Sequence, residues 1–247
     1  MRSFRELGAS ERAGAVLLTL WMNCRVVFGW KVLLFLAGTA IHFVAFCLIR
    51  ARMDEPITLG TVLAWLVWLP TTVFAVFFAM DLVSRERDAG LLETIFTVSV
   101  SPYRVWIIKF AVLMLSVTLL ALALIALTDR IVIELPVMLT LVYVLPPLVF
   151  FAALTVLFSL LFKNANAAGL CMAAVLGFVL LMARASEGQI SATVIFPYLN
   201  PFDMPPQEET FIWVRTVVYN KTAYTLLGGV WFWRALRWLD RRERLLQ

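Results

Sequence analysis

The side chains of this sequence that could do chemistry are concentrated in one charged stretch, residues 84–110, which begins Ser-Arg-Glu-Arg-Asp-Ala-Gly-Leu-Leu-Glu. We call residues 84–100 the island. Charge is otherwise scarce in the chain, and long apolar segments flank the stretch on both sides. A charged, amphipathic segment in this setting indicates a surface that docks onto another molecule. An ordinary connecting loop with a solvated charged side is the alternative.

Motifs for catalysis are missing from the sequence. No glycine belongs to a G-x-x-x-x-G-K-[ST] phosphate loop, so we expect no ATP binding by that route. There is no H-E-x-x-H, no G-x-S-x-G and no pair of carboxylates within an apolar segment. The cysteines are isolated from one another, which favours small apolar residues over metal ligands or a disulfide framework. We therefore expect no catalytic residue, no metal site and no enzyme activity in this chain.

The composition predicts an integral membrane protein. Of 247 residues, 62% are hydrophobic and only 15% are charged, and the mean hydropathy is +0.91. The apolar runs are continuous rather than alternating, which favours transmembrane helices over a β-barrel. The formal net charge of +5 does not indicate a nucleic-acid partner, because the basic residues lie at the ends of the apolar runs.

We predict one all-α transmembrane domain over residues 1–247. Its six spans cover about residues 31–49, 57–80, 103–128, 135–162, 165–183 and 217–238. An N-terminal helix over 13–30 carries tryptophans and is expected to lie in the membrane interface. Pro70 lies inside the second span, where it should kink the helix and free a carbonyl that neighbours must satisfy. The polar loop 184–210 packs as a cap over the outer end, which could gate exit, or is a plain connector.

Lysine and arginine positions predict the orientation. With a cytoplasmic N-terminus, fifteen of the 21 basic residues fall on the cytoplasmic side. Both termini and the island are then cytoplasmic, and the protein lies in the inner (plasma) membrane as a multi-pass protein. Membrane lipid is accordingly an expected partner.

Within the island, apolar side chains share one helical face: Leu91, Leu92, Ile95 and Phe96. Ser84 can cap the start of this helix, and Pro102 ends it before the third span. We therefore predict a short amphipathic helix over 84–100 that lies along the cytoplasmic face of the membrane.

The island and its surroundings resemble the signature between the second and third spans of the type-2 permease family of ATP-binding-cassette transporters. The matching residues are Glu86, Arg87, Gly90, Leu92, Glu93 and Lys109. The six spans, the interfacial helix and an Asn-Pro-Phe loop at 200–202 extend the resemblance over nearly the whole chain. Pro102 comes later than the family proline, which falls near Ser99, and this implies a longer or tilted island helix.

The resemblance implies that the island is a coupling helix that packs into a groove of a separate cytoplasmic ATPase subunit. The implied contact residues are Glu86, Arg87, Gly90, Leu91, Leu92, Glu93, Ile95 and Phe96. ATP and Mg would then bind in that partner and not in this chain. A second permease copy or paralogue is a further implied partner, and export is the implied direction. A non-transporting scaffold or assembly factor that anchors a cytoplasmic protein is the competing hypothesis.

Small residues recur every four positions in the fifth span, at Ala165, Gly169, Ala173 and Gly177. This pattern predicts close helix packing within the chain, or a face that lines the pathway or contacts a second permease. The only histidine, His42, is expected to be a neutral, hydrogen-bonded packing residue rather than a proton relay. Lys221 is expected to extend to the outer interface, with a substrate contact as the alternative.

Overall fold

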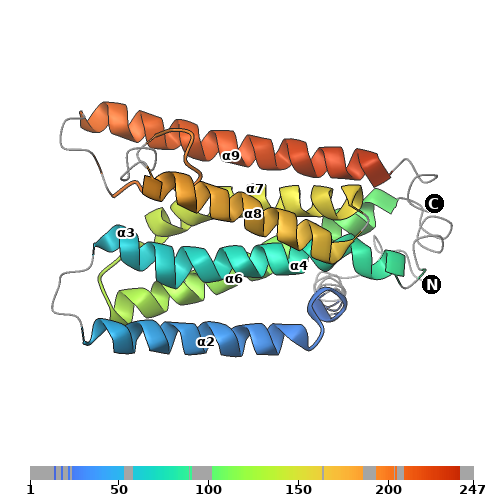
Figure 1. Ribbon diagram of the computed structural model, residues 1–247, viewed down its shortest axis with the longest axis horizontal. Coiled ribbons are helices and arrows are strands. Elements are labelled where there is room, and N and C mark those ends of the chain that lie inside the picture. The colour runs from blue at the N-terminus through green and yellow to red at the C-terminus, as the bar shows by residue number, and fades with distance from the viewer. Residues whose placement is uncertain are drawn as a thin grey trace.

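The computed structural model describes residues 14, 18, 22, 24–52, 58–88, 90, 102–162, 164–185, 193–202, 204 and 209–239. In this part of the chain every regular element is helical, as the sequence predicts. The elements are α2 (Lys31–Arg50), α3 (Leu59–Val62), the π-helix η1 (Leu63–Trp68), α4 (Leu69–Asp88), α6 (Pro102–Ile131), α7 (Val137–Leu161), α8 (Ala165–Ala185) and α9 (Thr210–Leu239). The long helices lie side by side in one bundle (Figure 1).

Five helical segments among the described residues are long and apolar enough to cross a membrane. They are Lys31–Arg50, Leu59–Arg87, Tyr103–Ile131, Val137–Leu161 and Ala165–Met182. The first and the last of these bury little of their apolar surface, and leave side chains such as Leu33 and Leu170 exposed. Helices that are apolar on their exposed side suit lipid rather than water, which confirms a multi-pass membrane protein. A sixth long helix, α9, packs along α7 (Figure 1).

The two ends of the bundle differ. Helices α4, α7 and α9 end where α2, α6 and α8 begin (Figure 1). We call this the island end, because residues 84–88 lie there. The opposite end contains residues 193–202, and we call it the loop end.

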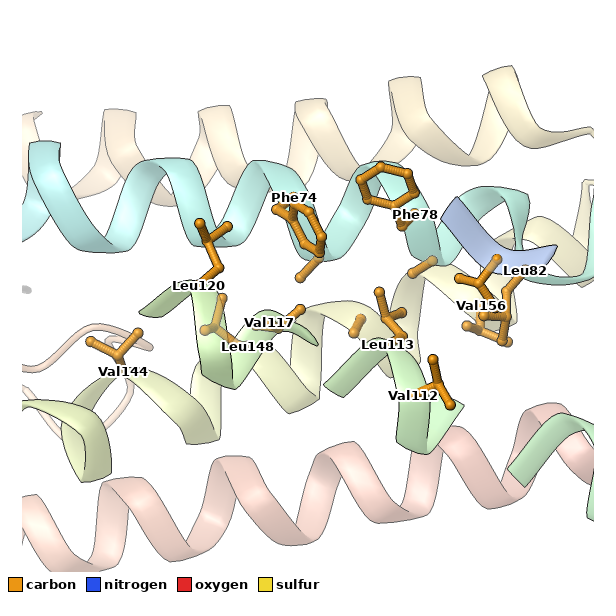
Figure 2. Close-up of a cluster of buried hydrophobic side chains, with 14 of the residues drawn as sticks. Phe74, Phe78, Leu82, Val112, Leu113, Val117, Leu120, Val144, Leu148 and Val156 are labelled. Atoms are coloured by element: carbon orange, nitrogen blue, oxygen red, sulfur yellow. The ribbon is translucent and has the colours of Figure 1, made fainter. Parts of the chain in front are cut away.

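The core lies where α4, α6 and α7 meet. Phe74 and Phe78 of α4 contribute large aromatic side chains, and Leu113 of α6 and Leu148 of α7 are fully buried beside them (Figure 2). The rings of Phe74 and Phe78 contact each other at a centroid distance of 4.6 Å. Because α4 and α7 are the most buried of the spanning helices, they form the centre of the bundle.

In the second span α3 is followed by the π-helical turn η1, after which the Leu69 N–H donates to the Ala64 carbonyl five residues back. In the same five-residue pattern, the donor to the Trp65 carbonyl would be the N–H of residue 70. Pro70 has no N–H, so this carbonyl lacks a backbone donor. His42 Nε2, from α2, donates to that carbonyl oxygen at 2.9 Å. The expectations that Pro70 frees a carbonyl and that His42 makes a hydrogen bond are therefore confirmed.

The island helix predicted over 84–100 does not begin at Ser84. Helix α4 continues past the predicted span end at Met80 and includes residues 84–88. Ser84 therefore lies inside a helix, and its hydroxyl donates back to the Met80 carbonyl at 2.8 Å instead of capping a new one. The helix continues because no glycine or proline separates these two residues.

Gly90 follows the end of α4. Its φ of +68° is the left-handed conformation that glycine adopts after a helix, and its N–H donates to the Arg87 carbonyl at 2.9 Å. Residues 91–100, which contain the predicted apolar face of the island, lie outside the described residues.

The remaining predicted spans agree closely with the helices. Helices α2, α6, α7 and α8 match the first, third, fourth and fifth spans to within about three residues at each end. Helix α9 begins at Thr210 rather than at Val217, because no helix-breaking residue lies between them. Of the predicted interfacial helix over 13–30, residues 24–28 are helical, and the chain turns at Gly29 before α2.

Candidate functional site

The last turns of α4, from Met80 to Asp88, lead into the island and contact several other elements. We call this segment the α4 end. Its arginines, Arg85 and Arg87, lie in the final turn, where positive side chains interact favourably with the helix dipole. Asp81 and Arg85 are one turn apart and so share one side of the helix.

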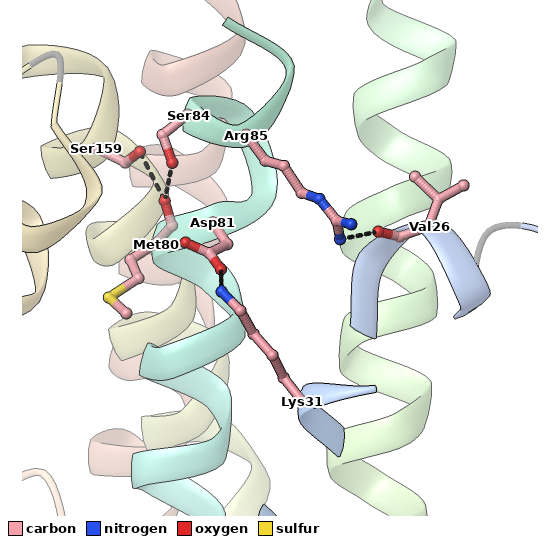
Figure 3. Close-up of polar contacts among 7 residues, drawn as sticks. All are labelled: Val26, Lys31, Met80, Asp81, Ser84, Arg85 and Ser159. Carbon is pink, nitrogen blue, oxygen red and sulfur yellow. Dashed lines mark hydrogen bonds and ion pairs between the residues drawn. The ribbon is translucent and has the colours of Figure 1, made fainter. Parts of the chain in front are cut away.

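That side is tied to the N-terminal part of the chain (Figure 3). Lys31, the first residue of α2, donates to the Asp81 carboxylate at 2.6 Å. Arg85 donates from its guanidinium to the Val26 carbonyl at 2.8 Å. The helical residues before α2 and the start of α2 are therefore both bonded to the α4 end.

A second side carries a buried ion pair with α6. Glu86 and Lys109 form a salt bridge, and they are only 8% and 4% exposed. The Lys109 ammonium also lies over the Trp106 ring, 4.7 Å from its centroid. These two residues lie on the helices that flank residues 89–101, so the pair joins the first residues of the island to the chain after it.

A third side packs on α7 and α8. The Met80 carbonyl accepts hydrogen bonds from Ser84 and from Ser159 of α7, the latter at 2.9 Å (Figure 3). Gly169 of α8 packs against the Met80 side chain, where an added Cβ would come within 2.8 Å of the sulfur. A single helix end of nine residues thus contacts α2, α6, α7, α8 and the residues before α2.

The three predicted partner contacts that the structure describes, Glu86, Arg87 and Gly90, differ in how deeply they are buried. Glu86 is buried and paired with Lys109, whereas the sequence predicts it at a partner interface. Arg87 is half-buried and Gly90 is exposed. The other predicted contacts lie outside the described residues: Leu91, Leu92, Glu93, Ile95 and Phe96. Partner binding itself stays a prediction for all of these residues.

The small residues of α8 divide into two groups. Ala165 and Gly169 are half-buried, and Gly169 packs inside the chain against α4. Ala173 and Gly177 are exposed, and nothing lies within 4 Å of a Cβ added at Gly177. Another close helix contact involves Gly228 of α9, where an added Cβ would lie 2.9 Å from Val149 of α7 and 3.1 Å from the backbone nitrogen of Phe150. The adjacent glycines Gly228 and Gly229, in a span of otherwise large side chains, are the sequence signal that could have predicted this contact.

At the loop end, residues 193–202 form an irregular segment that we call the loop segment. Side chains of α7 and α9 donate hydrogen bonds to its backbone carbonyls. The pairs are Asn220 with residues 194 and 196, Tyr224 with 195, Lys221 with 197, Tyr143 with 198, and Trp213 with 201. Five consecutive carbonyls, from residue 194 to 198, are therefore each satisfied by a side chain. Irregular backbone at membrane depth requires such donors.

Tyr198 anchors the loop segment in the core. Its ring stacks on Phe151 of α7 and makes an edge contact with Trp68 of η1. Its hydroxyl pairs with the Thr72 hydroxyl of α4 at 2.7 Å. Burial raises the pKa of the Tyr198 phenol well above its ordinary value, so the group stays neutral. Residues 193–202 of the predicted loop 184–210 therefore pack over one end of the bundle, whereas the outer location of that end and gating stay predictions.

Lys221 does not extend to the interface as expected. The side chain is buried at 7% exposure, and its ammonium lies 3.4 Å from the Pro197 carbonyl and 4.5 Å from the centroid of the Tyr143 ring. Lys221 is buried because the loop segment covers this part of α9. The sequence of α9 alone does not show that another segment packs over it.

Comparison with known proteins identifies no relative. No protein-family model, no curated protein and no solved structure matches this chain. Among the described residues, no three side chains of His, Cys, Asp or Glu come together in a group that could hold a metal ion.

Proposed function

We propose that this chain is the membrane-spanning permease subunit of an ATP-binding-cassette exporter. The observation that carries the proposal is the set of contacts made by the α4 end. Because this segment includes the start of the island, is bonded to α2, α6, α7 and the residues before α2, and packs on α8, a force on the island acts on most of the bundle. A connecting loop with a solvated charged side has no need of such contacts.

In this proposal α9 is the sixth span. At 1.5 Å per residue its 30 residues are about 45 Å long, enough to cross a hydrocarbon core of about 30 Å. The island end then faces the cytoplasm, in agreement with the basic residues that the sequence places there. The loop end faces outward, and the cell membrane is the location.

The proposed mechanism couples the two ends. ATP and Mg bind to a separate ATPase subunit, whose rearrangement displaces the island. The α4 end transmits this displacement to α2, α6, α7 and α8, and shifts the balance between inward-open and outward-open packings. The loop segment closes the outer end between cycles, because its carbonyls bond to α7 and α9 and Tyr198 packs against α7, η1 and α4.

A second permease copy is part of the same proposal. Helices α2 and α8 expose most of their apolar surface, and Ala173 and Gly177 leave room for close approach of another helix. The translocation pathway would then lie between the two copies.

The test is purification of the full chain from its native membrane in mild detergent, with companion proteins identified by mass spectrometry. We expect an ATP-hydrolysing subunit in stoichiometric amount. Glu93→Lys, which reverses a charge in the island, should reduce its recovery severalfold while membrane insertion stays normal. Glu134→Lys is the matched control, because Glu134 is an exposed carboxylate at the loop end.

Two outcomes contradict the proposal. If a photo-cross-linker at position 93 captures a cytoplasmic protein without ATPase activity, the scaffold hypothesis is favoured. If labelling of a cysteine at position 93 occurs only from outside the cell, the orientation and the coupling role are both wrong.

A further inference from the structure

Lys221 is a buried cation whose surroundings do not match its charge. An ammonium has three N–H donors. Within the described residues, Lys221 has one acceptor, the Pro197 carbonyl at a long 3.4 Å, and the face of the Tyr143 ring. Burial of a charged group is unfavourable unless it is paired, and ionisable residues inside membrane bundles are commonly functional for that reason.

The other lysines of the bundle show what pairing looks like in this protein. Lys109 is as deeply buried and forms a salt bridge with Glu86. Lys31 is half-exposed and is nevertheless bonded to Asp81. Lys221 alone among the described lysines has no carboxylate partner. Among the described residues, the protein thus keeps the Lys221 amine in its interior without a carboxylate beside it.

Two further buried polar atoms, one on the residue before Lys221 and one on α7, are also unsatisfied. The Asn220 side-chain oxygen and the Thr140 hydroxyl are buried and have no hydrogen-bond partner. Thr140 lies about one helical turn from Tyr143 on α7, and therefore on the same side of that helix. Lys221 and Thr140 offer N–H and O–H donors that an oxyanion could accept from.

The depth of Lys221 suits a lipid-like molecule. Tyr143, beside Lys221, is six residues into α7, about 9 Å from the point where that helix begins. This position is near the proposed outer boundary of the hydrocarbon core. The loop segment covers it, and the cover is held by hydrogen bonds that can exchange for others.

We propose that Lys221 is the receptor for one anionic oxyanion group, such as a phosphate, carried by a lipid-like molecule. This inference rests on the proposed function and names the class of molecule that the permease moves. When the loop segment moves away, the oxyanion replaces the Pro197 carbonyl as the partner of the ammonium. The long apolar part of the molecule contacts the exposed apolar helices.

The test uses the purified full chain alone in neutral detergent, so its result does not depend on an ATPase. Native mass spectrometry measures binding of phosphatidylglycerol and phosphatidylcholine, and a separate arm adds inorganic phosphate as a competitor. We expect a preference of about tenfold for phosphatidylglycerol, the size of effect that one charge-assisted hydrogen bond produces. Asn220→Ala releases two loop carbonyls and should increase that binding.

Lys221→Met should remove the preference, and Lys221→Gln serves as a second variant that keeps an N–H donor for the loop. Arg215→Met is the matched control, because Arg215 is an exposed cation on the same helix. A preference that survives in Lys221→Met and Lys221→Gln overturns the proposal, as does equal binding of the two lipids by the wild type and Asn220→Ala. If inorganic phosphate displaces the lipid at equal concentration, the lipid-like carrier is wrong.

Discussion

The two ends of the bundle use different chemistry to hold their parts together. At the island end, lysines pair with carboxylates across helices, as Lys109 does with Glu86 and Lys31 with Asp81. At the loop end, side chains of α7 and α9 bond to main-chain carbonyls of one irregular segment. An ion pair connects two rigid helices, whereas a row of hydrogen bonds, most of them from neutral donors, holds a segment that has no helix of its own.

This difference suggests a division of roles. Buried ion pairs are costly to break from one side only, so they suit contacts that persist while the bundle moves. Neutral hydrogen bonds to a carbonyl contribute about 0.5–1.5 kcal/mol each and are readily exchanged for bonds to water or ligand. The contacts at the island end are therefore suited to passing a displacement from one helix to another. The contacts at the loop end are suited to releasing the loop segment.

The largest expected effect is at the buried ion pair. Glu86→Lys should lower the free energy of unfolding by about 3–5 kcal/mol, because it leaves Lys109 buried without its partner and adds a like charge. The exchanged pair, Glu86→Lys with Lys109→Glu, should recover most of the loss. Yield and thermal unfolding midpoint in detergent measure both. If Glu86 instead acts by contacting a partner, the exchange restores stability but not recovery of that partner.

At the loop end, Asn220→Ala should be less severe. It leaves the carbonyls of residues 194 and 196 without donors, at about 1–3 kcal/mol for each group that stays buried. The reactivity of a cysteine placed in the loop segment should rise. Thr222→Ala, an exposed neighbour, is the control and should change neither property. An unchanged reactivity in Asn220→Ala would show that the donors do not hold the cover.

The contact between α7 and α9 supports the loop end and can be tested with adjacent glycines. A Cβ at Gly228 would lie 2.9 Å from Val149 Cγ1 and 3.1 Å from the backbone nitrogen of Phe150. Gly228→Ala should therefore destabilise the protein by about 1–3 kcal/mol. Gly229→Ala has open space around it and should be neutral or slightly stabilising in a helix. Equal thermal midpoints for the two variants would contradict this packing.

The smallest effect is expected at the exposed ion pair of the island end. The Lys31 and Asp81 side chains are 45% and 18% exposed, so Asp81→Asn should cost about 0.2–1 kcal/mol. The loss should shrink at high salt, because salt screens exposed charges. A loss as large as that of Glu86→Lys would remove the distinction between exposed and buried pairs at this end.

The sequence predicted the elements much better than their contacts. Continuous apolar runs mark helices α2, α6, α7 and α8 almost to their ends, because span length depends on local composition alone. The island start was wrong for a local reason as well. Ser84 is a good cap only if the chain before it is not helical, and nothing in the sequence breaks the helix between Met80 and Ser84.

Contacts between helices could not be predicted from the sequence, because each charged residue has many potential partners elsewhere in the chain. Glu86 lies in the family-like signature and was assigned to an external surface, yet Lys109, which belongs to the same signature, is its internal partner. The sequence predicts Lys221 at the outer interface because it falls inside the sixth span, from which a lysine can extend its ammonium to the membrane surface. Its burial depends on the loop segment, whose fold is set by donors on two other helices.

The length of the π-helical turn before Pro70 sets how the two parts of this helix are rotated relative to each other. A residue added to a helix rotates everything beyond it by about 100°. Leu66 in the turn and Phe74 after it are both buried, so the present rotation satisfies the core on both sides of the proline. Loss of one residue from Leu63–Trp68 would turn one of these faces to the lipid, and so the length of this turn should be as constrained as the identity of any side chain within it.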